Sequence, residues 1–226
     1  VAAWGGSACE AWMNDDMLKA FPEAAANIPA AGGEIKSKNR TPSVLFKGML
    51  NPLIGMSMRG VIWYQGEDNW NRAHTYTDMF STMIKGWRDL WGQGEFPFYY
   101  CQIAPYDYSI ITEPGKEIIN SAYLREAQMN AEKVVPNSGM AVLMDAGWAE
   151  GIHPSDKRTP GERLALLALG KTYGVKGIGC ESRVYKSMEI KGDTVVVSFD
   201  RAPEWIAGKH SFGSTQFKLA GEDRVF

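Results

Sequence analysis

The stretch that decides the fold is Gly60-Val61-Ile62-Trp63-Tyr64-Gln65-Gly66-Glu67, in which apolar side chains give way abruptly to polar ones. The apolar and aromatic run of residues 58–64 predicts a short buried strand that ends at this change. Similar runs at 96–104 and 140–145 predict two further strands. The chain therefore contains at least three buried strands that lie far apart in the sequence.

Helical patterns separate these strands. Apolar side chains recur at intervals of three and four residues over 74–91, and Gly92 stands where such a helix would end. Two more amphipathic helices are predicted over 121–133 and 160–173, the second of them followed by Gly174. Strands that alternate with helices predict an α/β fold, with a parallel sheet and helices on both faces.

The pattern changes after about residue 179. Val184 to Ile190 and Thr194 to Phe199 predict the two strands of an antiparallel hairpin that turns at Gly192. Residues 217–219 and 225–226 predict further strand. This part of the chain is expected to be β-rich.

Composition limits the functions that the chain can serve. With 24 basic and 26 acidic side chains in 226 residues, it lacks the basic excess that nucleic-acid binding needs. No apolar run approaches the ~18 residues of a membrane span. The cysteines Cys9, Cys101 and Cys180 are widely spaced and odd in number, which argues against a disulfide framework or a zinc site. Aromatic residues make up 12%, which suits a flat-faced ligand such as a carbohydrate, although the same side chains can simply fill a core.

Three polar segments follow predicted strands, at the edge where open α/β sheets build their sites. They are Trp4-Gly5-Gly6-Ser7-Ala8 after the apolar start, residues 63–69, and residues 145–157. In the first, paired glycines let the backbone turn and present N–H groups to an anion, though Gly-Gly-Ser also occurs in plain turns. In the second, the Asn69 amide can donate to a developing oxyanion, or Asn69 or Asp68 can cap the helix that follows.

The third segment offers a general base. His153 is fixed by Pro154 and has Glu150 three residues before it and Asp145 eight residues before it. A histidine base needs a carboxylate or carbonyl that holds its second nitrogen, and both carboxylates are candidates. A purely structural role is the alternative for a histidine taken alone.

Together these segments resemble the sialate O-acetylesterase family of SGNH hydrolases. The resemblance runs in order over essentially the whole chain, and its most specific parts are residues 63–67 and Ile152-His153-Pro154. Other matching blocks are 4–7, 10–12, 42–46, 48–49, 96–99, 124–128 and 220–223. The resemblance implies a flavodoxin-like sheet and a serine carboxylic-ester hydrolase that removes O-acetyl groups from sialic acid or a related sugar. It also implies a periplasmic or secreted protein with no metal or organic cofactor.

The resemblance assigns catalytic roles residue by residue. Gly6 is similar to the family's oxyanion glycine, which gives its backbone N–H to the intermediate. Asn69 is similar to the asparagine of a Gly-x-x-Asn block whose glycine here is Gly66. His153 is similar to the general base.

Substrate-binding roles are implied for three further residues. Gln65 and Glu67 are expected to line the pocket and orient their neighbours. Arg125 is expected to contact the substrate or brace the pocket, with a surface ion pair as the alternative.

The chain departs from the family pattern in two places. The family's nucleophilic serine lies on a Gly-Gln-Ser-Asn loop upstream of the Trp-Gly-Gly block, and no such loop occurs here. The nucleophile is therefore expected before Val1, with Ser7 as the alternative. The usual aspartate three residues before the histidine is Glu150 here, so Glu150, Asp145 or a backbone carbonyl is expected to orient His153.

The expected organisation is a hydrolase domain at 1–179, without its N-terminal strand and nucleophile loop, and the start of a truncated β-rich accessory unit at 180–226. Two other functions stay open on the sequence. One is a catalytically inactive carbohydrate-binding module, which the absent serine loop and the eight tryptophans favour. The other is an acetylxylan esterase, which shares the fold and mechanism and differs only in the sugar.

Overall fold

The structure, a computed structural model, describes residues 2–117, 119–201 and 220–221, and it divides into two compact units, Val1–Glu181 and Ser182–Phe226. The first unit contains a parallel sheet of three strands in the order β1 (Val61–Trp63), β2 (Phe98–Cys101) and β3 (Ser138–Ala141). The predicted α/β class and parallel sheet are confirmed.

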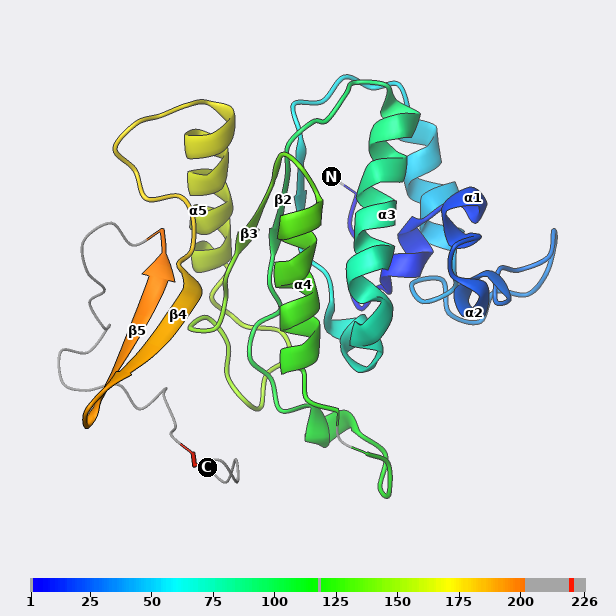
Figure 1. The fold of residues 1–226 in the computed structure, drawn as a ribbon. Helices are drawn as coiled ribbons and strands as arrows, with labels where there is room; N and C mark the ends of the chain where they lie inside the picture. The colour runs from blue at the N-terminus through cyan, green and yellow to red at the C-terminus, as the bar shows by residue number, and fades with distance from the viewer. Residues whose placement is uncertain (1, 118, 202–219, 222–226) are drawn as a thin grey trace. The chain divides into compact units, whose positions relative to one another are not determined.

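Helices cover both faces of this sheet, as predicted. Helices α3 (Ala73–Trp91) and α4 (Ala122–Val134) lie side by side on one face, and α5 (Arg158–Leu167) lies on the other (Figure 1). Helix α3 ends at Gly92, whose N–H donates to the carbonyl of Arg88.

Strand β2 shows how the sheet is buried on both sides. Phe98 and Tyr100 belong to the larger core under α3 and α4, whereas Tyr99 and Cys101 pack with the α5 residue Leu167. Successive side chains of a strand point to opposite faces, so a strand between two helical layers is apolar throughout. This explains why residues 96–104 form a continuous apolar run in the sequence.

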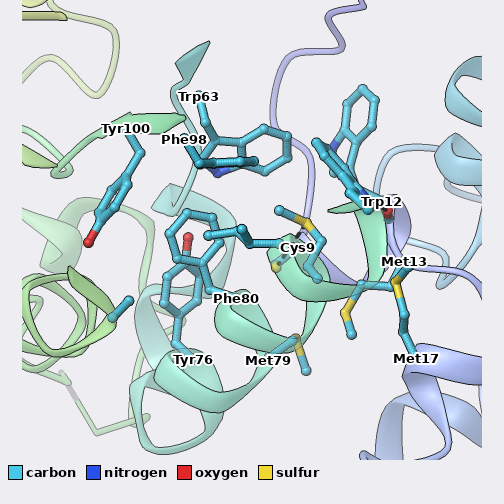
Figure 2. Packing of buried hydrophobic residues seen from close by; sticks show 14 of the residues in the cluster. Cys9, Trp12, Met13, Met17, Trp63, Tyr76, Met79, Phe80, Phe98 and Tyr100 are labelled. Carbon is cyan, nitrogen blue, oxygen red and sulfur yellow. Dashed lines mark hydrogen bonds between the residues drawn. The ribbon is translucent and has the colours of Figure 1, made fainter. Parts of the chain in front are cut away.

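The larger core is organised around Trp63 at the end of β1 (Figure 2). Its ring meets those of Trp12 and Trp87 edge to face, with centroids 5.7 Å and 5.5 Å away. Phe80 of α3 stacks against it at 6.3 Å and is itself fully buried. Aromatic pairs of this geometry stabilise a fold beyond the area they bury, so several tryptophans are core residues, the alternative that composition left open.

Several predicted boundaries differ from the observed ones. The strands predicted at 58–64 and 96–104 are shorter, at Val61–Trp63 and Phe98–Cys101. The third strand was expected at 140–145 but ends at Ala141, because β2 also ends there and the Gln102 N–H makes the last sheet bond to the Ala141 carbonyl. The last helix was expected to begin at Pro160, but α5 begins at Arg158 and widens into a π-helical turn at Ala168–Thr172.

The N-terminal segment was also expected to follow a strand, and this is wrong for the described residues. Residues 2–4 form no strand, and the Ala8 N–H donates to the carbonyl of Asn39 in a loop instead. The short helices of this region were not predicted because they carry no long periodicity. They are a 3₁₀ turn at Cys9–Trp12, α1 (Asp15–Leu18), α2 (Pro22–Ala25), a π-helical turn at Phe46–Leu50 and a 3₁₀ turn at Asn51–Leu53. Two further 3₁₀ segments occur at Glu67–Arg72 and Tyr108–Ile111.

The second unit contains the predicted hairpin. Strands β4 (Val184–Lys191) and β5 (Thr194–Asp200) pair antiparallel, with a register irregularity between Tyr185 and Ser187. The strands expected at 217–219 and 225–226 lie outside the described residues. That this unit is the start of an accessory domain stays a prediction.

Neither a membrane-spanning helix nor a metal cluster is found within the ranges described above. No helix there is both long and apolar enough to cross a bilayer. No group of three or more histidine, cysteine or acidic side chains there is arranged to hold a metal ion.

Candidate active site

The three polar segments meet at one cavity of about 370 Å³. The N-terminal segment contributes residues 4–7, the segment after β1 contributes 64, 65, 67 and 68, and the loop before α5 contributes 152–154 and 157. A cavity of this volume falls in the range that small-molecule sites occupy. Of the predicted site residues, Gly6, Gln65, Glu67 and His153 line this cavity, whereas Asn69, Arg125, Asp145 and Glu150 do not.

Gly6 turns the N-terminal segment toward the cavity. Its backbone has a φ of +61°, which glycine adopts more readily than other residues. The side chain of Asn39 holds this turn by donating to the Gly6 carbonyl at 2.7 Å. Within the described part of the chain the Gly6 N–H has no acceptor, so it remains available to an anion.

Gln65 connects the first two segments. Its Nε2 donates to the Ser7 carbonyl at 2.8 Å and to the Asn69 Oδ1 at 2.6 Å, and its Oε1 accepts from the Tyr76 hydroxyl at 3.0 Å. Both amide hydrogens are thereby used, so Gln65 shapes the cavity wall, and its side chain has no free donor for a ligand.

Gly66 is required for the sharp turn that follows. Its φ is +151°, and a Cβ at this position would lie 2.6 Å from Ile103 and 2.9 Å from the Gln128 amide. Any other residue would therefore be strained and would displace buried neighbours. The turn brings Glu67 into the wall directly after the strand.

Asn69 lies beneath the cavity and is buried. Its Oδ1 accepts from the Cys9 N–H at 2.9 Å as well as from Gln65, and its Nδ2 donates to the Glu10 carboxylate at 2.9 Å. The Glu10 carboxylate thus uses one of the two hydrogens on the amide nitrogen, and Asn69 does not line the cavity, so its expected bond to an oxyanion stays a prediction. The alternative, a side-chain cap on the next helix, is not observed.

Glu67 is an acid of the cavity wall whose pKa is shifted. Burial raises the pKa of its carboxyl group, against smaller lowering effects from its own backbone N–H and from the Lys157 ammonium. The Lys157 ammonium itself lies 5.5 Å from the centre of the Tyr64 ring. Acids with raised pKa values in a cavity are frequent in functional sites.

His153 enters the cavity from an exposed loop, and Pro154 beside it is buried. Among the described residues, no hydrogen bond or ion pair joins His153 to Asp145 or Glu150. The Asp145 carboxylate accepts two bonds from the Arg163 guanidinium, at 2.7 Å and 2.8 Å. Such a bidentate pair engages both carboxylate oxygens, so the Asp145 side chain is anchored to Arg163 of α5.

Arg125 does not reach the cavity. It lies on α4, and its guanidinium donates to the Ser121 hydroxyl at 2.9 Å, one turn before it. Burial lowers its pKa. The alternative, a surface ion pair, is not found among the described residues, and the expected role toward a substrate stays a prediction.

Several wall residues were not predicted as site residues. Trp70 lines the cavity and stacks on Tyr108 at 4.6 Å, and Ile111 and Arg40 complete the wall. Trp70 directly follows the polar stretch that ends at Asn69. Its aromatic side chain next to polar residues was therefore its only signal in the sequence. Arg40 and Asn39 come from a loop without periodicity, and no sequence pattern points to them.

Among the described residues, Ser7 is the one serine in the cavity wall. It is 7% exposed, and its Oγ accepts a hydrogen bond from the Trp12 indole at 2.9 Å. No hydrogen bond between Ser7 and His153 is present in the described structure. A serine nucleophile needs such a base within reach, which disfavours Ser7 in that role.

Comparison with known proteins identifies a matching family and several relatives. Residues 1–166 match the family model described as carbohydrate esterase, sialic acid-specific acetylesterase. The sialate O-acetylesterase of Homo sapiens is 30% identical over 205 residues, which cover 84% of this chain and 38% of that protein. The sialate O-acetylesterase of Rattus norvegicus is 35% identical over 162 residues, which cover 66% of this chain and 30% of that protein.

A solved structure is similar as well. The crystal structure of a carbohydrate acetylesterase from Xanthomonas citri superposes with a TM-score of 0.71 at 34% identity, and the match covers 88% of this chain and 42% of that one. The chain thus spans less than half the length of each of these relatives.

The raised pKa of Glu67 makes stability depend on pH. The folded protein holds this proton more tightly than the unfolded chain does, so its contribution to stability is present at low pH. It is lost as pH rises from the unfolded value of about 4.3 through the higher folded value. Glu67→Gln should therefore increase the free energy of unfolding more at about pH 8 than at about pH 4. Urea unfolding at both pH values measures this.

The exposed Glu126 of α4 provides the control for that experiment. Glu126→Gln should leave the difference between the two pH values close to that of the wild type. An unchanged pH dependence in Glu67→Gln would contradict the electrostatic description of the cavity.

Proposed function

The chain belongs to the sialic acid-specific acetylesterase family of carbohydrate esterases, and on that premise we propose that the protein hydrolyses O-acetyl esters on sugars. The family resemblance seen in the sequence is thereby confirmed. The observation that carries the proposal is the cavity where Gly6, Glu67 and His153 come together. An N–H that can donate to an oxyanion and an imidazole base are two of the groups that acyl transfer requires, and a serine nucleophile is the third.

In the proposed first step, a serine hydroxyl attacks the acetyl carbonyl carbon while His153 takes its proton. The Gly6 N–H donates to the oxygen that becomes negative. The bond between the acetyl carbon and the sugar oxygen then breaks, and His153 gives its proton to that oxygen. The sugar leaves, and the acetyl group stays on the serine.

In the second step, water attacks the acetyl carbon while His153 takes one of its protons. The serine oxygen leaves and recovers the proton from His153, and acetate is released. The serine is proposed to lie outside the described chain, which is consistent with the indole bond that Ser7 accepts. Asn69 and Gln65 act by holding the cavity wall in place.

The substrate is proposed to be O-acetylated sialic acid or a related sugar. Relatives from Homo sapiens and Rattus norvegicus are named sialate O-acetylesterase, and the matching Xanthomonas citri protein is a carbohydrate acetylesterase. A periplasmic or secreted location stays a prediction from the resemblance.

Replacing His153 tests the proposal directly. In the native-length protein, His153→Ala should lower kcat/KM for acetate release by about 10²–10⁴-fold, because no other group takes the serine proton. Its urea midpoint should match the wild type, since His153 is exposed. Lys133→Ala at the exposed end of α4 should retain full activity. Unchanged acetate release by the His153→Ala variant would contradict the proposal.

The carboxylate that orients His153 is proposed to be Glu150. Asp145 is held by Arg163, whereas Glu150 is exposed three residues before the histidine. Glu150→Gln should lower kcat/KM by about tenfold or more, equivalent to at least about 1.4 kcal/mol of transition-state stabilisation. Asp145→Asn should mainly lower the free energy of unfolding. Steady-state kinetics and urea unfolding of both variants decide this, and a larger kinetic loss in Asp145→Asn would assign the role to Asp145.

A further inference from the structure

The Asn39 side chain bonds to two consecutive peptide groups of the turn that carries Gly6. Its Nδ2 lies 2.7 Å from the Gly6 carbonyl oxygen and 3.4 Å from the Gly5 carbonyl oxygen, and it donates to both. Both glycines line the cavity that contains His153, whereas Asn39 does not. Asn39 therefore acts on this turn without taking part in the cavity wall.

The bond to the Gly5 carbonyl sets the direction of the Gly6 N–H. These two groups belong to one peptide unit, and in a trans peptide the carbonyl and the N–H point in opposite directions. None of the described peptide bonds is cis. Because the Gly5 carbonyl is directed at Asn39, the Gly6 N–H is directed away from it.

Little else fixes this peptide unit. Among the described residues, no other group donates to the Gly5 or the Gly6 carbonyl. Glycine has no Cβ, so a peptide unit between two glycines can rotate with little steric resistance. That rotation would bring the Gly5 carbonyl to where the N–H now lies and replace a hydrogen-bond donor by an acceptor. In the described structure, the Asn39 amide is the restraint against it.

The orientation of the Asn39 amide is fixed in turn. The Ser37 hydroxyl donates to the Asn39 Oδ1 at 3.0 Å, which leaves Nδ2 for the two glycine carbonyls. The backbone carbonyl of Asn39 accepts from the Ala8 N–H at 3.0 Å, two residues after Gly6. Asn39 is thus bonded to the turn through its side chain and through its backbone.

We propose that Asn39 is a positioning residue whose amide keeps the Gly6 N–H directed into the cavity, where it donates to the oxyanion. The inference rests on the proposed function. A donor that is already aligned needs no reorientation during the reaction, so it stabilises the transition state. The ground state gains little from the same donor, so Asn39 is expected to affect kcat more than KM.

Asn39→Asp is the most direct variant. It keeps the size of the side chain and replaces the amide donor by a carboxylate, which repels the two glycine carbonyls. Asn137→Asp is the matched control, because the Asn137 amide also donates to a backbone carbonyl, that of Glu95, at 2.6 Å. Asn137 lies directly before β3 and does not line the cavity.

Acetate release is measured on the native-length proteins with 4-nitrophenyl acetate and with O-acetylated sialic acid. Asn39→Asp should lower kcat by about tenfold or more and should leave KM within about twofold of the wild type. The rate of reaction with a fluorophosphonate, whose phosphoryl oxygen needs the same N–H donor, should fall by a similar factor. Asn137→Asp should match the wild type in each measurement.

A second pair of variants separates positioning from a merely structural role. Asn39→Ala removes the amide without adding a charge, and it also serves if Asn39→Asp does not fold. Ser37→Ala keeps the Asn39 side chain but releases its amide, so it should lower kcat by a smaller factor than Asn39→Ala does. In the Asn39→Ala background, Ser37→Ala should have no further effect, because both changes act through one amide.

Three kinetic results overturn the inference. They are a wild-type kcat in both Asn39 variants, a loss confined to KM, and effects of Ser37→Ala and Asn39→Ala on kcat that are simply additive. Failure of the proposed function is distinguishable, because the wild type would then release no acetate and would not react with the fluorophosphonate. Crystal structures of the wild type and Asn39→Asp still test the inference in that case. The peptide unit between Gly5 and Gly6 should be reversed in the variant, and an unchanged peptide would contradict the inference.

Discussion

The side-chain amide of Gln65 joins parts of the chain that are far apart, and the site depends on it. It donates to the carbonyl of Ser7, 58 residues earlier, and to Asn69, while its oxygen accepts from Tyr76 on α3. Each group left unpaired in such a buried network would cost about 1–3 kcal/mol. The network therefore fixes the loop that carries Gly6 against the end of β1.

The aromatic core supports this network from below. Trp63 precedes the polar turn by two residues, and its contacts with Trp12 and Trp87 hold the end of β1 against the N-terminal segment and α3. Gly66 then redirects the chain where no side chain fits. The stretch from Trp63 to Glu67 therefore serves both the fold and the cavity. Its aromatic start is buried in the core, and its glycine turn brings polar side chains to the cavity wall.

Much of the fold could be predicted from the sequence because its signals are local. Helix α3 shows both a long periodicity and its terminal Gly92, and the β4–β5 hairpin shows two strand patterns around a glycine. The strand that ends at Ala141 was predicted to be too long because its length is set by pairing with its neighbour β2. That limit cannot be read from the sequence of β3 itself. The short N-terminal helices have too few turns to produce a periodic pattern.

The candidate site was predictable as three segments but not as a set of contacts. Strand ends indicated that Gly6, Glu67 and His153 belong together, and the cavity contains all three. The directions of Asn69 and Asp145 depend on Glu10 and Arg163, which are distant partners that no local pattern reveals. Arg125 was assigned to the site only because it lies in block 124–128 of the family resemblance. In the structure its guanidinium donates to the nearby Ser121 hydroxyl.

The central claim is that the cavity shared by the three segments is where an acetyl ester is cleaved. The most direct test is a crystal structure of the native-length protein after reaction with a fluorophosphonate, which forms a covalent adduct with an activated serine. The account predicts an adduct inside the 370 Å³ cavity, on a serine other than Ser7, with its phosphoryl oxygen at the Gly6 N–H and His153 within hydrogen-bond reach. An adduct on Ser7 would contradict the position of the nucleophile. An adduct outside the cavity, or a folded protein that does not react, would contradict the claim itself.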